Sequence, residues 1–484
     1  MLRASGVSLA KKAGSSIRKL SSKAATATAS FPEAKKRFIP ASGTYPRGFF
    51  VGGMHCGVKK RGGPDLAVIL SDRETTASAV FTTNQFCAAP VQLDRETINR
   101  ARGAQKQIVR AVVVNSGCAN AVTGEQGLKD AKVMAEAGDK LVRKFDAGRK
   151  GATTTTKTTA IDGDDKGEGD LASLVMSTGV IGQRLPLDNI CKGIGEIELG
   201  ESHDMWMRAA VAHMTTDTFP KLLSREISIE GPQAAEDGKK TVIRMAGITK
   251  GAGMIHPNMA TLLGTVCTDA AITQPLLDKA LAYAVARSFN AISIDGDMST
   301  NDTIAVIANG AASAAAPVID SEDSAEYAVF RSELTKFMAE LASLVVRDGE
   351  GATKFITVEV EGARSFGDAK RVASTIATSS LVKTAFYGKD ANWGRILCAV
   401  GYAGIPLDTS KVSLAIYPGD GTAPLALVSA GEPLLPLDET RASEILDQED
   451  VIVRVGLGLG SESARIYTCD LSHDYVSINA DYRS

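Results

Sequence analysis

Residues 250–265 read Lys250-Gly-Ala-Gly-Met-Ile-His-Pro-Asn-Met-Ala-Thr261-Leu-Leu-Gly-Thr265. A glycine-rich segment leads through Pro257 to a small residue, Ala260, and an apolar strand is predicted to begin directly after Thr261. A threonine hydroxyl can attack the preceding carbonyl through a five-membered ring if the backbone is held bent, and flexibility before the site with rigidity after it suits that strain. The stretch has what a self-cleaving threonine needs. Glycine-rich loops that enter strands are common, however, so on its own it favours a surface loop before a core strand.

Cleavage before Thr261 would free the α-amine of that residue. An α-amino group titrates at about pH 8, so a useful fraction is a neutral base at cell pH. That amine can take the proton from its own hydroxyl, which is the N-terminal threonine arrangement for activating a weak nucleophile. Cleavage would divide residues 31–484 into an α chain, 31–260, and a β chain of 224 residues, 261–484.

The rest of the sequence mixes strand and helix patterns without strict βαβα alternation, which predicts an α/β protein with mixed sheets and outer helices. Strands are predicted at 65–71, 77–83, 108–115, 174–181, 226–230, 241–249, 262–267, 303–308, 353–360, 412–417 and 451–458, and helices from about 124, at 273–289 and at 322–346. The Gly456–Gly460 run is predicted to end a strand at a hairpin, because no helix pattern follows it. Residues 147–170 are of low complexity and predict a surface insertion.

Composition excludes several classes of protein. A hydrophobic content of 44% with 23% charged residues is typical of globular chains, and a net charge of -2 argues against a nucleic-acid partner. No apolar run approaches the length of a membrane span. The seven cysteines are scattered and the histidines dispersed, so no metal site is predicted. Asp295, Asp297 and Asp302 lack the spacing of a Ca²⁺ loop and its closing glutamate, which favours a structural turn.

The first thirty residues differ from the remainder. No acidic residue precedes Glu33, whereas six basic residues and seven serines occur in this stretch, with apolar residues at helical spacing. This pattern predicts a mitochondrial transit peptide over residues 1–30, and with it a location in the mitochondrial matrix. The alternative is a disordered tail that targets nothing.

Several ordered motifs carry a resemblance that covers nearly the whole chain after residue 30. They are the 250–263 stretch, Asn115-Ser-Gly-Cys-Ala-Asn-Ala-Val-Thr-Gly124, Ser177-Thr-Gly-Val-Ile-Gly182, Ser293-Ile-Asp-Gly-Asp-Met-Ser-Thr-Asn-Asp302, Asp348-Gly-Glu-Gly-Ala-Thr-Lys354, Gly388-Lys-Asp-Ala-Asn-Trp-Gly-Arg395 and Ile478-Asn-Ala-Asp-Tyr-Arg-Ser484. Together they resemble the bifunctional ornithine acetyltransferase/glutamate N-acetyltransferase family of arginine biosynthesis. The resemblance implies a layered αββα sandwich similar to N-terminal-nucleophile hydrolases, autocatalytic cleavage between Ala260 and Thr261, and a heterotetramer of two α and two β chains.

The same resemblance implies an activity. The family transfers acetyl from N2-acetyl-L-ornithine to L-glutamate through an acetyl-enzyme, in a ping-pong reaction. No bound cofactor is implied, and acetyl-CoA is a possible further acetyl donor that the sequence does not settle.

Site residues follow from the matching motifs. Thr261 is the implied nucleophile, and Thr123 and Gly124 the implied oxyanion hole, between a predicted strand and a helix start where N–H groups can face an oxyanion. The implied substrate-binding residues are Thr178, Lys250, Thr261, Glu350, Asn479 and Ser484. A lysine suits the substrate carboxylate and a glutamate the ornithine ammonium, although each is also common as a surface group. The family often ends in threonine, so Ser484 is a departure that keeps the hydroxyl.

Two other functions remain open from sequence. One is an aminopeptidase-like self-cleaving hydrolase of similar fold, with water as the acceptor in place of glutamate. The other is a non-catalytic binding protein that retains the fold. Glutamate-independent release of ornithine would favour the first, and an uncut chain without acetyl exchange the second.

Overall fold

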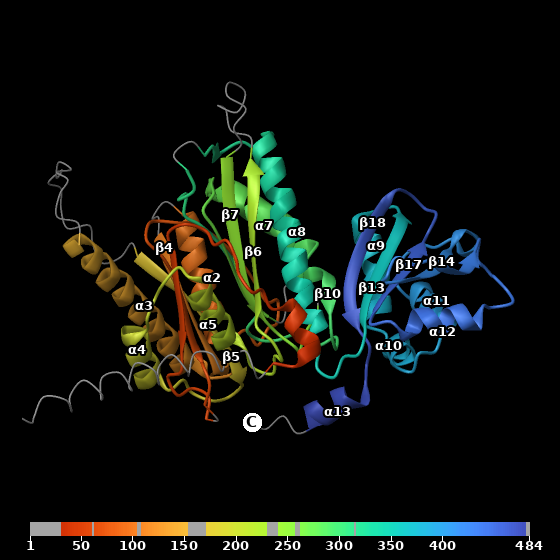
Figure 1. The fold of residues 1–484 in the computed structure, drawn as a ribbon, viewed down its shortest axis with the longest axis horizontal. Helices are drawn as coiled ribbons and strands as arrows, with labels where there is room; N and C mark the ends of the chain where they lie inside the picture. The colour runs from red at the N-terminus through yellow and green to blue at the C-terminus, as the bar shows by residue number, and fades with distance from the viewer. Residues whose placement is uncertain are drawn as a thin grey trace, which may run out of the picture.

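The structure is a computed structural model that describes residues 31–60, 62–103, 108–152, 171–229, 241–256, 262–313 and 316–480. The predicted transit peptide, residues 153–170 of the predicted insertion, and the site residues Ala260, Thr261 and Ser484 lie outside them. The described chain forms a sandwich of two sheets and a second lobe built on a third sheet (Figure 1).

The first sheet of the sandwich has the order β1-β2-β4-β5, antiparallel except between β4 and β5. Its strands are β1 (Phe49–Met54), β2 (Leu66–Ser71), β4 (Ile108–Cys118) and β5 (Leu171–Val180). Alternate residues of β2 face opposite ways, as the period of a strand requires. Leu66 and Val68 pack in one core with helices α3 and α4, whereas Ala67 and Ile69 pack in another core with the second sheet. The helices on the outer side are α3 (Gly124–Ala152) and α4 (Leu187–Glu196), and α2 (Ala89–Arg102) contacts the edge strands β5 and β3 (Thr76–Phe81) of the two sheets.

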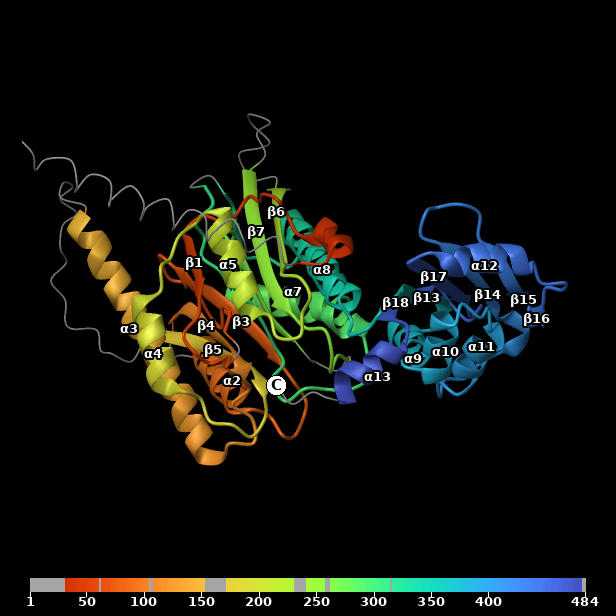
Figure 2. The same cartoon turned by 60° about the horizontal axis from the view of Figure 1, so that its bottom comes forward.

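The second sheet has the order β3-β11-β8-β7-β6, with β11 and β8 parallel. Its strands are β3 (Thr76–Phe81), β11 (Thr303–Ala308), β8 (Leu263–Thr268), β7 (Thr241–Lys250) and β6 (Lys221–Ile229). Met245 and Val266 pack outwards against α7 (Gln274–Ala286) and α8 (Ala325–Arg347), while Ile248 and Ile307 pack inwards with the first sheet. Helix α5 (His203–His213) contributes the buried Trp206 to that inner core. The layers are therefore helix, sheet, sheet and helix, which confirms the αββα sandwich (Figure 2).

A seven-stranded third sheet, in the order β10-β18-β13-β17-β14-β15-β16, forms most of the second lobe (blue in Figure 1). Its strands are β10 (Ile292–Ser293), β13 (Phe355–Ala363), β14 (Ser413–Pro418), β15 (Leu425–Ser429), β16 (Glu432–Pro433), β17 (Asp450–Gly456) and β18 (Glu462–Cys469). The helices that follow β13 are α9 (Phe366–Ala377), α10 (Ser380–Tyr387), α11 (Trp393–Gly401), α12 (Glu439–Asp447) and α13 (His473–Ala480). Short elements are η2 (Glu33–Phe38), β9 (Ala271–Ile272), η3 (Phe289–Ala291), β12 (Val318–Ile319) and η4 (Thr409–Lys411). Helix α13 lies below the junction of sandwich and lobe, away from the other lobe helices (Figure 1).

Most predicted strands coincide with observed ones, and 303–308 does so to the residue. Two differences have a clear cause. The predicted hairpin after Gly456 is wrong, because β17 and β18 pair with opposite edges of β13 and the connection crosses that strand. Helix α3 continues to Ala152 and takes in residues 147–152 of the predicted insertion.

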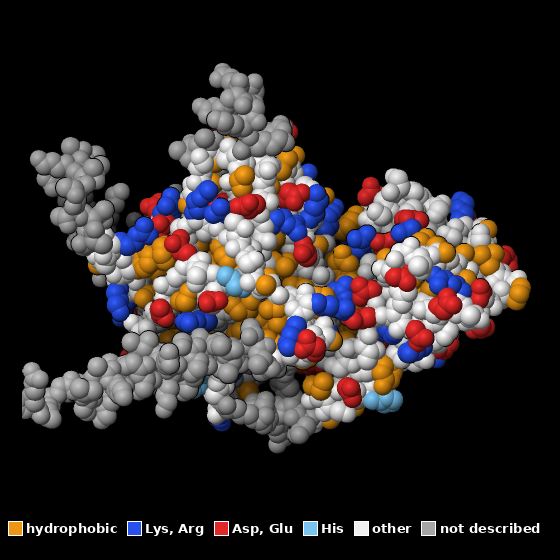
Figure 3. All heavy atoms as spheres, viewed as in Figure 1, with side chains coloured by type: hydrophobic (Ala, Val, Ile, Leu, Met, Phe, Trp, Pro, Cys, Tyr) orange, Lys and Arg blue, Asp and Glu red, His pale blue; other side chains and the backbone are white. Residues whose placement is uncertain are grey.

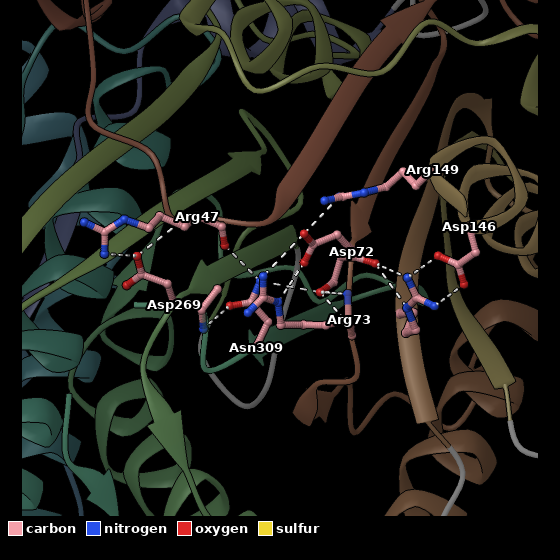
Figure 4. A network of polar contacts seen from close by, with 10 residues as sticks. Arg47, Asp72, Arg73, Asp146, Arg149, Asp269 and Asn309 are labelled. Atoms are coloured by element: carbon pink, nitrogen blue, oxygen red, sulfur yellow. Dashed lines mark hydrogen bonds and ion pairs between the residues drawn. The ribbon is translucent and has the colours of Figure 1, made fainter. Parts of the chain in front are cut away.

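A polar network joins the two sheets of the sandwich at the end where β8 and β11 finish (Figure 4). Asp72, directly after β2, accepts a hydrogen bond from Arg149 of α3 at 2.9 Å. Asn309, directly after β11, donates to the carbonyl of Arg47 at 2.9 Å, and the Arg47 amide donates to Asp269 at 3.3 Å. This end of the sandwich is therefore closed by side-chain and backbone hydrogen bonds between the sheets.

Asp94 of α2 is fully buried against β5. Its Oδ1 accepts a hydrogen bond from the Val175 amide at 2.9 Å, and Oδ2 has no hydrogen-bond partner among the described residues. Burial raises the pKa of Asp94 well above its usual value. Because the folded state holds the proton more tightly than the unfolded state, this carboxyl destabilises the fold increasingly as the pH rises above its unfolded pKa.

Asp94→Asn is therefore expected to stabilise the protein by roughly 1–3 kcal/mol near pH 8, because the neutral amide needs no bound proton to stay uncharged in this buried position, and a tenfold change in proton affinity on folding is worth about 1.4 kcal/mol. The gain should shrink at pH 5, which thermal unfolding at the two pH values measures. Asp188→Asn, on the exterior helix α4, is the matched control and should change little. An equal effect of Asp94→Asn at both pH values would contradict the role of the proton.

Acidic and basic side chains are interspersed on the face of the molecule seen in Figure 3, in keeping with the near-neutral net charge of -2. Within the described ranges, the helices are too short or too polar to cross a bilayer.

Candidate active site

A cavity of about 400 Å³ opens at the end of the sandwich where β5 and β7 finish and β8 begins. It lies at the opposite end from the polar network, since β8 and β11 start here and finish there. Its described lining residues are Ala119, Thr178, Gly179, Val180, Ile181, Thr215, Thr216, Lys250, Gly253, Met254, Leu262, Leu263, Ser299, Thr300, Asn301, Asp302, Glu350 and Asn479. Four predicted substrate-binding residues, Thr178, Lys250, Glu350 and Asn479, thus meet at one cavity from distant parts of the sequence.

Lys250 is the last residue of β7 and pairs with Leu263, the first residue of β8. Only 9% of Lys250 is exposed, and its Nζ donates to the Thr178 hydroxyl at 3.3 Å. Burial lowers the pKa of Lys250, and the nearby carboxylate of Asp217 acts against that shift. An ammonium held at the wall of a cavity in this way is suited to bind a carboxylate.

Glu350 lies in the turn after α8 and is also 9% exposed. Its amide donates to the carbonyl of Ala252 at 2.8 Å, and its Oε2 accepts a hydrogen bond from Asn479 of α13 at 2.9 Å. A Cβ atom on Gly253 would come within 2.3 Å of Oε2, so any larger residue there would displace this carboxylate from its present position. The cavity therefore carries a carboxylate as well as an ammonium.

Thr123 lies between β4 and α3 and Gly124 is the first residue of α3, so the pair stands at a helix start after a strand, as predicted. The Thr123 hydroxyl donates to Oδ1 of Asn120 at 2.8 Å, and the backbone is left-handed at Asn120, Val122 and Gly124. Neither Thr123 nor Gly124 is among the described residues that line the cavity. The loop joins the cavity wall through a neighbouring contact, in which the amide of Gly182 donates to the carbonyl of Ala121 at 2.9 Å.

Three predicted site residues lie outside the described residues: Ala260, Thr261 and Ser484. Leu262, which is bonded to Thr261, lines the cavity and accepts a hydrogen bond on its carbonyl from the Thr303 amide at 3.0 Å.

A buried ion network behind the cavity was not predicted. Lys221, with a fully buried side chain, is 2.6 Å from Asp217 and 2.6 Å from Asp348. Asp217 also accepts a hydrogen bond from the amide of Gly251 at 2.7 Å, next to Lys250. Asp348 lies two residues before Glu350 and accepts a hydrogen bond from the Thr218 amide at 2.8 Å. The network therefore supports the lysine and the glutamate of the cavity together.

A role for Asn301 was likewise not predicted from the sequence. Its side-chain amide donates to the carbonyl of Ala119 at 2.6 Å and to that of Ser177 at 2.9 Å. It thereby joins the start of β11, in the second sheet, to the end of the first sheet at the cavity. Two features of the sequence could have pointed to these residues. The polar segment Thr215–Lys221, between a helix and a strand, contains Asp217 and Lys221 of the ion network, and the motif that ends at Asp302 contains Asn301.

Comparison with known proteins gives a consistent result. Residues 50–484 match the ArgJ family. The arginine biosynthesis bifunctional protein ArgJ, mitochondrial, of Schizosaccharomyces pombe is 52% identical over 452 residues, 93% of this chain and 95% of the relative. The protein of the same name from Yarrowia lipolytica is 51% identical over 455 residues, 93% of this chain and 96% of the relative.

Solved structures give shorter matches. The arginine biosynthesis bifunctional protein ArgJ of Bacillus halodurans is 39% identical, with a TM-score of 0.40, over 45% of this chain and 96% of that chain. The ornithine acetyltransferase of Mycobacterium tuberculosis, solved with ornithine, is 30% identical, with a TM-score of 0.32, over 46% of this chain and 97% of that chain. A family match from residue 50 to residue 484, with relatives about half identical over nearly their whole length, shows that this chain belongs to the ArgJ family.

Proposed function

We propose that this chain is a mitochondrial N-acetyltransferase of arginine biosynthesis that moves acetyl from N2-acetyl-L-ornithine to L-glutamate. The observation that carries the proposal is the cavity that joins Thr178, Lys250, Glu350 and Asn479 beside Leu262, the residue bonded to Thr261. The relatives named above are arginine biosynthesis proteins of mitochondria, and one solved relative is an ornithine acetyltransferase bound to ornithine.

The charges of the cavity match the donor substrate. N-acetylornithine carries an α-carboxylate and a side-chain ammonium, and the cavity offers the ammonium of Lys250 and the carboxylate of Glu350. Asn479 positions the carboxylate of Glu350 from α13, and Thr178 positions Lys250. Two charge-assisted contacts at opposite ends of one substrate fix its orientation as well as its affinity.

Chemistry begins with cleavage between Ala260 and Thr261, which frees the α-amine of the threonine. That amine takes the hydroxyl proton as the oxygen of Thr261 attacks the acetyl carbonyl of the donor. Ornithine leaves with a proton on its nitrogen, and an acetyl ester remains on the threonine. The neutral amine of glutamate then attacks the ester, which releases N-acetylglutamate and restores the hydroxyl. The amides of the Thr123–Gly124 loop stabilise the oxyanion in both half-reactions.

The proposal also covers the assembly of the α and β chains and a second acetyl donor. We infer two α and two β chains for each active particle and no bound cofactor, with acetyl-CoA able to charge Thr261 in place of N-acetylornithine. Native mass spectrometry of the processed protein tests the assembly. Formation of N-acetylglutamate from acetyl-CoA and glutamate, without N-acetylornithine, tests the second donor.

The deciding experiment follows ornithine release from N-acetylornithine with and without glutamate. Release that depends on glutamate and yields N-acetylglutamate in equal amount supports acetyl transfer. Equal release in the absence of glutamate would instead identify a hydrolase that uses water as the acceptor.

Glu350→Gln is expected to raise the KM for N-acetylornithine by roughly 10- to 100-fold, because a neutral amide replaces a charged hydrogen-bond partner of the ammonium. The KM for glutamate should change much less, since glutamate has no side-chain ammonium. Steady-state kinetics with each substrate varied in turn measure the two effects, and Glu361→Gln, at an exposed position in the second lobe, is the control. Equal changes in both KM values would contradict a specific contact with ornithine.

A further inference from the structure

We propose that Asp295 is a positioning residue for self-cleavage, acting through the backbone of the segment that leads to the scissile bond. The inference rests on the proposed cleavage between Ala260 and Thr261, and it assigns a role to a carboxylate that the sequence suggested was only part of a structural turn. Asp295 follows β10, on the β-chain side of the cleavage point, whereas the segment it holds is the end of the α chain.

Both oxygens of Asp295 are used. Oδ2 accepts a hydrogen bond from the Met254 amide at 2.6 Å, and Oδ1 accepts one from the Ile255 amide at 2.9 Å. The amide of Asp297 donates to Oδ1 at 3.2 Å and fixes the carboxylate within its own turn. A carboxylate bound by successive amides of another segment fixes the direction of that segment, which a single contact would not do.

The segment so held is in an unfavourable conformation. Met254 has a φ of 58°, in the left-handed region that non-glycine residues rarely adopt. Such a residue costs of order 1–3 kcal/mol and persists only where its surroundings hold it. The side chain of Met254 is 44% exposed, so burial of that side chain does not explain the conformation. The paired hydrogen bonds to Asp295 do.

The next residue is fixed from both sides. The carbonyl of Ile255 accepts hydrogen bonds from the Ile294 amide at 2.8 Å and from the Ser293 hydroxyl at 3.3 Å. The side chain of Ile255 is buried, at 1% exposure. Only residues 256–260 separate Ile255 from the proposed cleavage point, so the chain enters the scissile segment from a fixed position and direction.

Self-cleavage depends on such a fixed approach. The hydroxyl of Thr261 attacks the carbonyl carbon of Ala260, the peptide C–N bond breaks, and the nitrogen leaves as the new α-amine after taking the hydroxyl proton. Water then hydrolyses the resulting ester to give the Ala260 carboxylate and restore the threonine hydroxyl. Each step needs the carbonyl to face the hydroxyl, and misplacement by about 1 Å can lower the rate of such a step about 100-fold.

The test measures the rate at which freshly translated full-length chain becomes two fragments, by quantitative mass spectrometry over time. Asp295→Asn is expected to slow cleavage by about 10- to 100-fold, because the amide nitrogen opposes one of the two backbone donors. Asp297→Asn, an exposed acid in the same turn, is the matched control and should cleave at the wild-type rate. Thermal unfolding of each variant reports whether it has folded.

A rescue distinguishes positioning from a general loss of structure. Glycine adopts positive φ without strain, so Met254→Gly combined with Asp295→Asn should cleave several-fold faster than Asp295→Asn alone. No gain in the double variant, or a wild-type rate in folded Asp295→Asn, would overturn the inference. If Asp295→Asn does not fold, Asp295→Ser, whose single hydroxyl replaces the two carboxylate oxygens, is measured in the same way, and a wild-type rate there has the same meaning. An uncut wild-type chain would refute the proposed self-cleavage instead.

Discussion

Thr261→Ala is expected to leave residues 31–484 as one uncut polypeptide and to lower acetyl transfer by at least about 10⁴-fold. Alanine lacks the hydroxyl that attacks the peptide bond and, later, the acetyl carbonyl. The wild-type protein should give two masses, one for a fragment that ends at Ala260 and one for a fragment of 224 residues that begins at Thr261. Intact-mass spectrometry and ornithine release measure the two effects on the same preparation.

Thr261→Ser is the informative control, since it keeps a hydroxyl and should still be cut and retain measurable transfer. Thr265→Ala changes a nearby threonine, on β8, whose buried hydroxyl lies outside the proposed chemistry, and should leave cleavage intact. Two fragments from Thr261→Ala would place the cleavage elsewhere. A single uncut chain in wild type would remove the amine base from the mechanism and favour a non-catalytic relative.

Lys221→Met is expected to lower the free energy of unfolding of the sandwich by about 3–5 kcal/mol, the usual cost of removing one partner from a buried ion network. Methionine is of similar length but leaves Asp217 and Asp348 buried without the cation that lies 2.6 Å from each. Burial alone would raise the pKa of Asp217, and the charges of Lys221 and Lys250 outweigh it and lower that pKa.

Urea unfolding followed by tryptophan fluorescence measures this loss, because the two tryptophans report on different parts of the molecule. Trp206 lies in the sandwich core and Trp393 begins α11 of the second lobe, so a Trp393→Phe background isolates the sandwich. Lys336→Met breaks an exposed pair with Glu333 and should cost less than about 1 kcal/mol. A similarly small loss for Lys221→Met would show that the buried network contributes little.

Local sequence patterns predicted most of the sandwich strands, but not β1 (Phe49–Met54). Alternating or continuous apolar runs bounded by polar residues mark strands whatever their partners, and β7, β8 and β11 followed that rule closely. Pairing between strands is not a local property. The hairpin predicted at Gly456 failed because β13, nearly a hundred residues earlier, lies between β17 and β18.

The site shows the same difference between local patterns and long-range contacts. The motifs marked Lys250 and Glu350 individually, and the fold brought both to one cavity. Sequence gave no sign that Asp217 contacts the backbone beside Lys250, or that Asp295 holds the segment before the cleavage point. Both contacts depend on tertiary structure, because each joins residues more than thirty positions apart.

The position of α13 bears on how the protein is best handled in the laboratory. Asn479 is in the cavity wall, and residues 480–484 after it span at most about 18 Å when fully extended. A purification tag fused after Ser484 would therefore begin close to the mouth of the cavity and compete with substrate for access. An affinity tag placed before residue 31, or in the exposed Ala430–Gly431 turn of the second lobe, avoids that crowding.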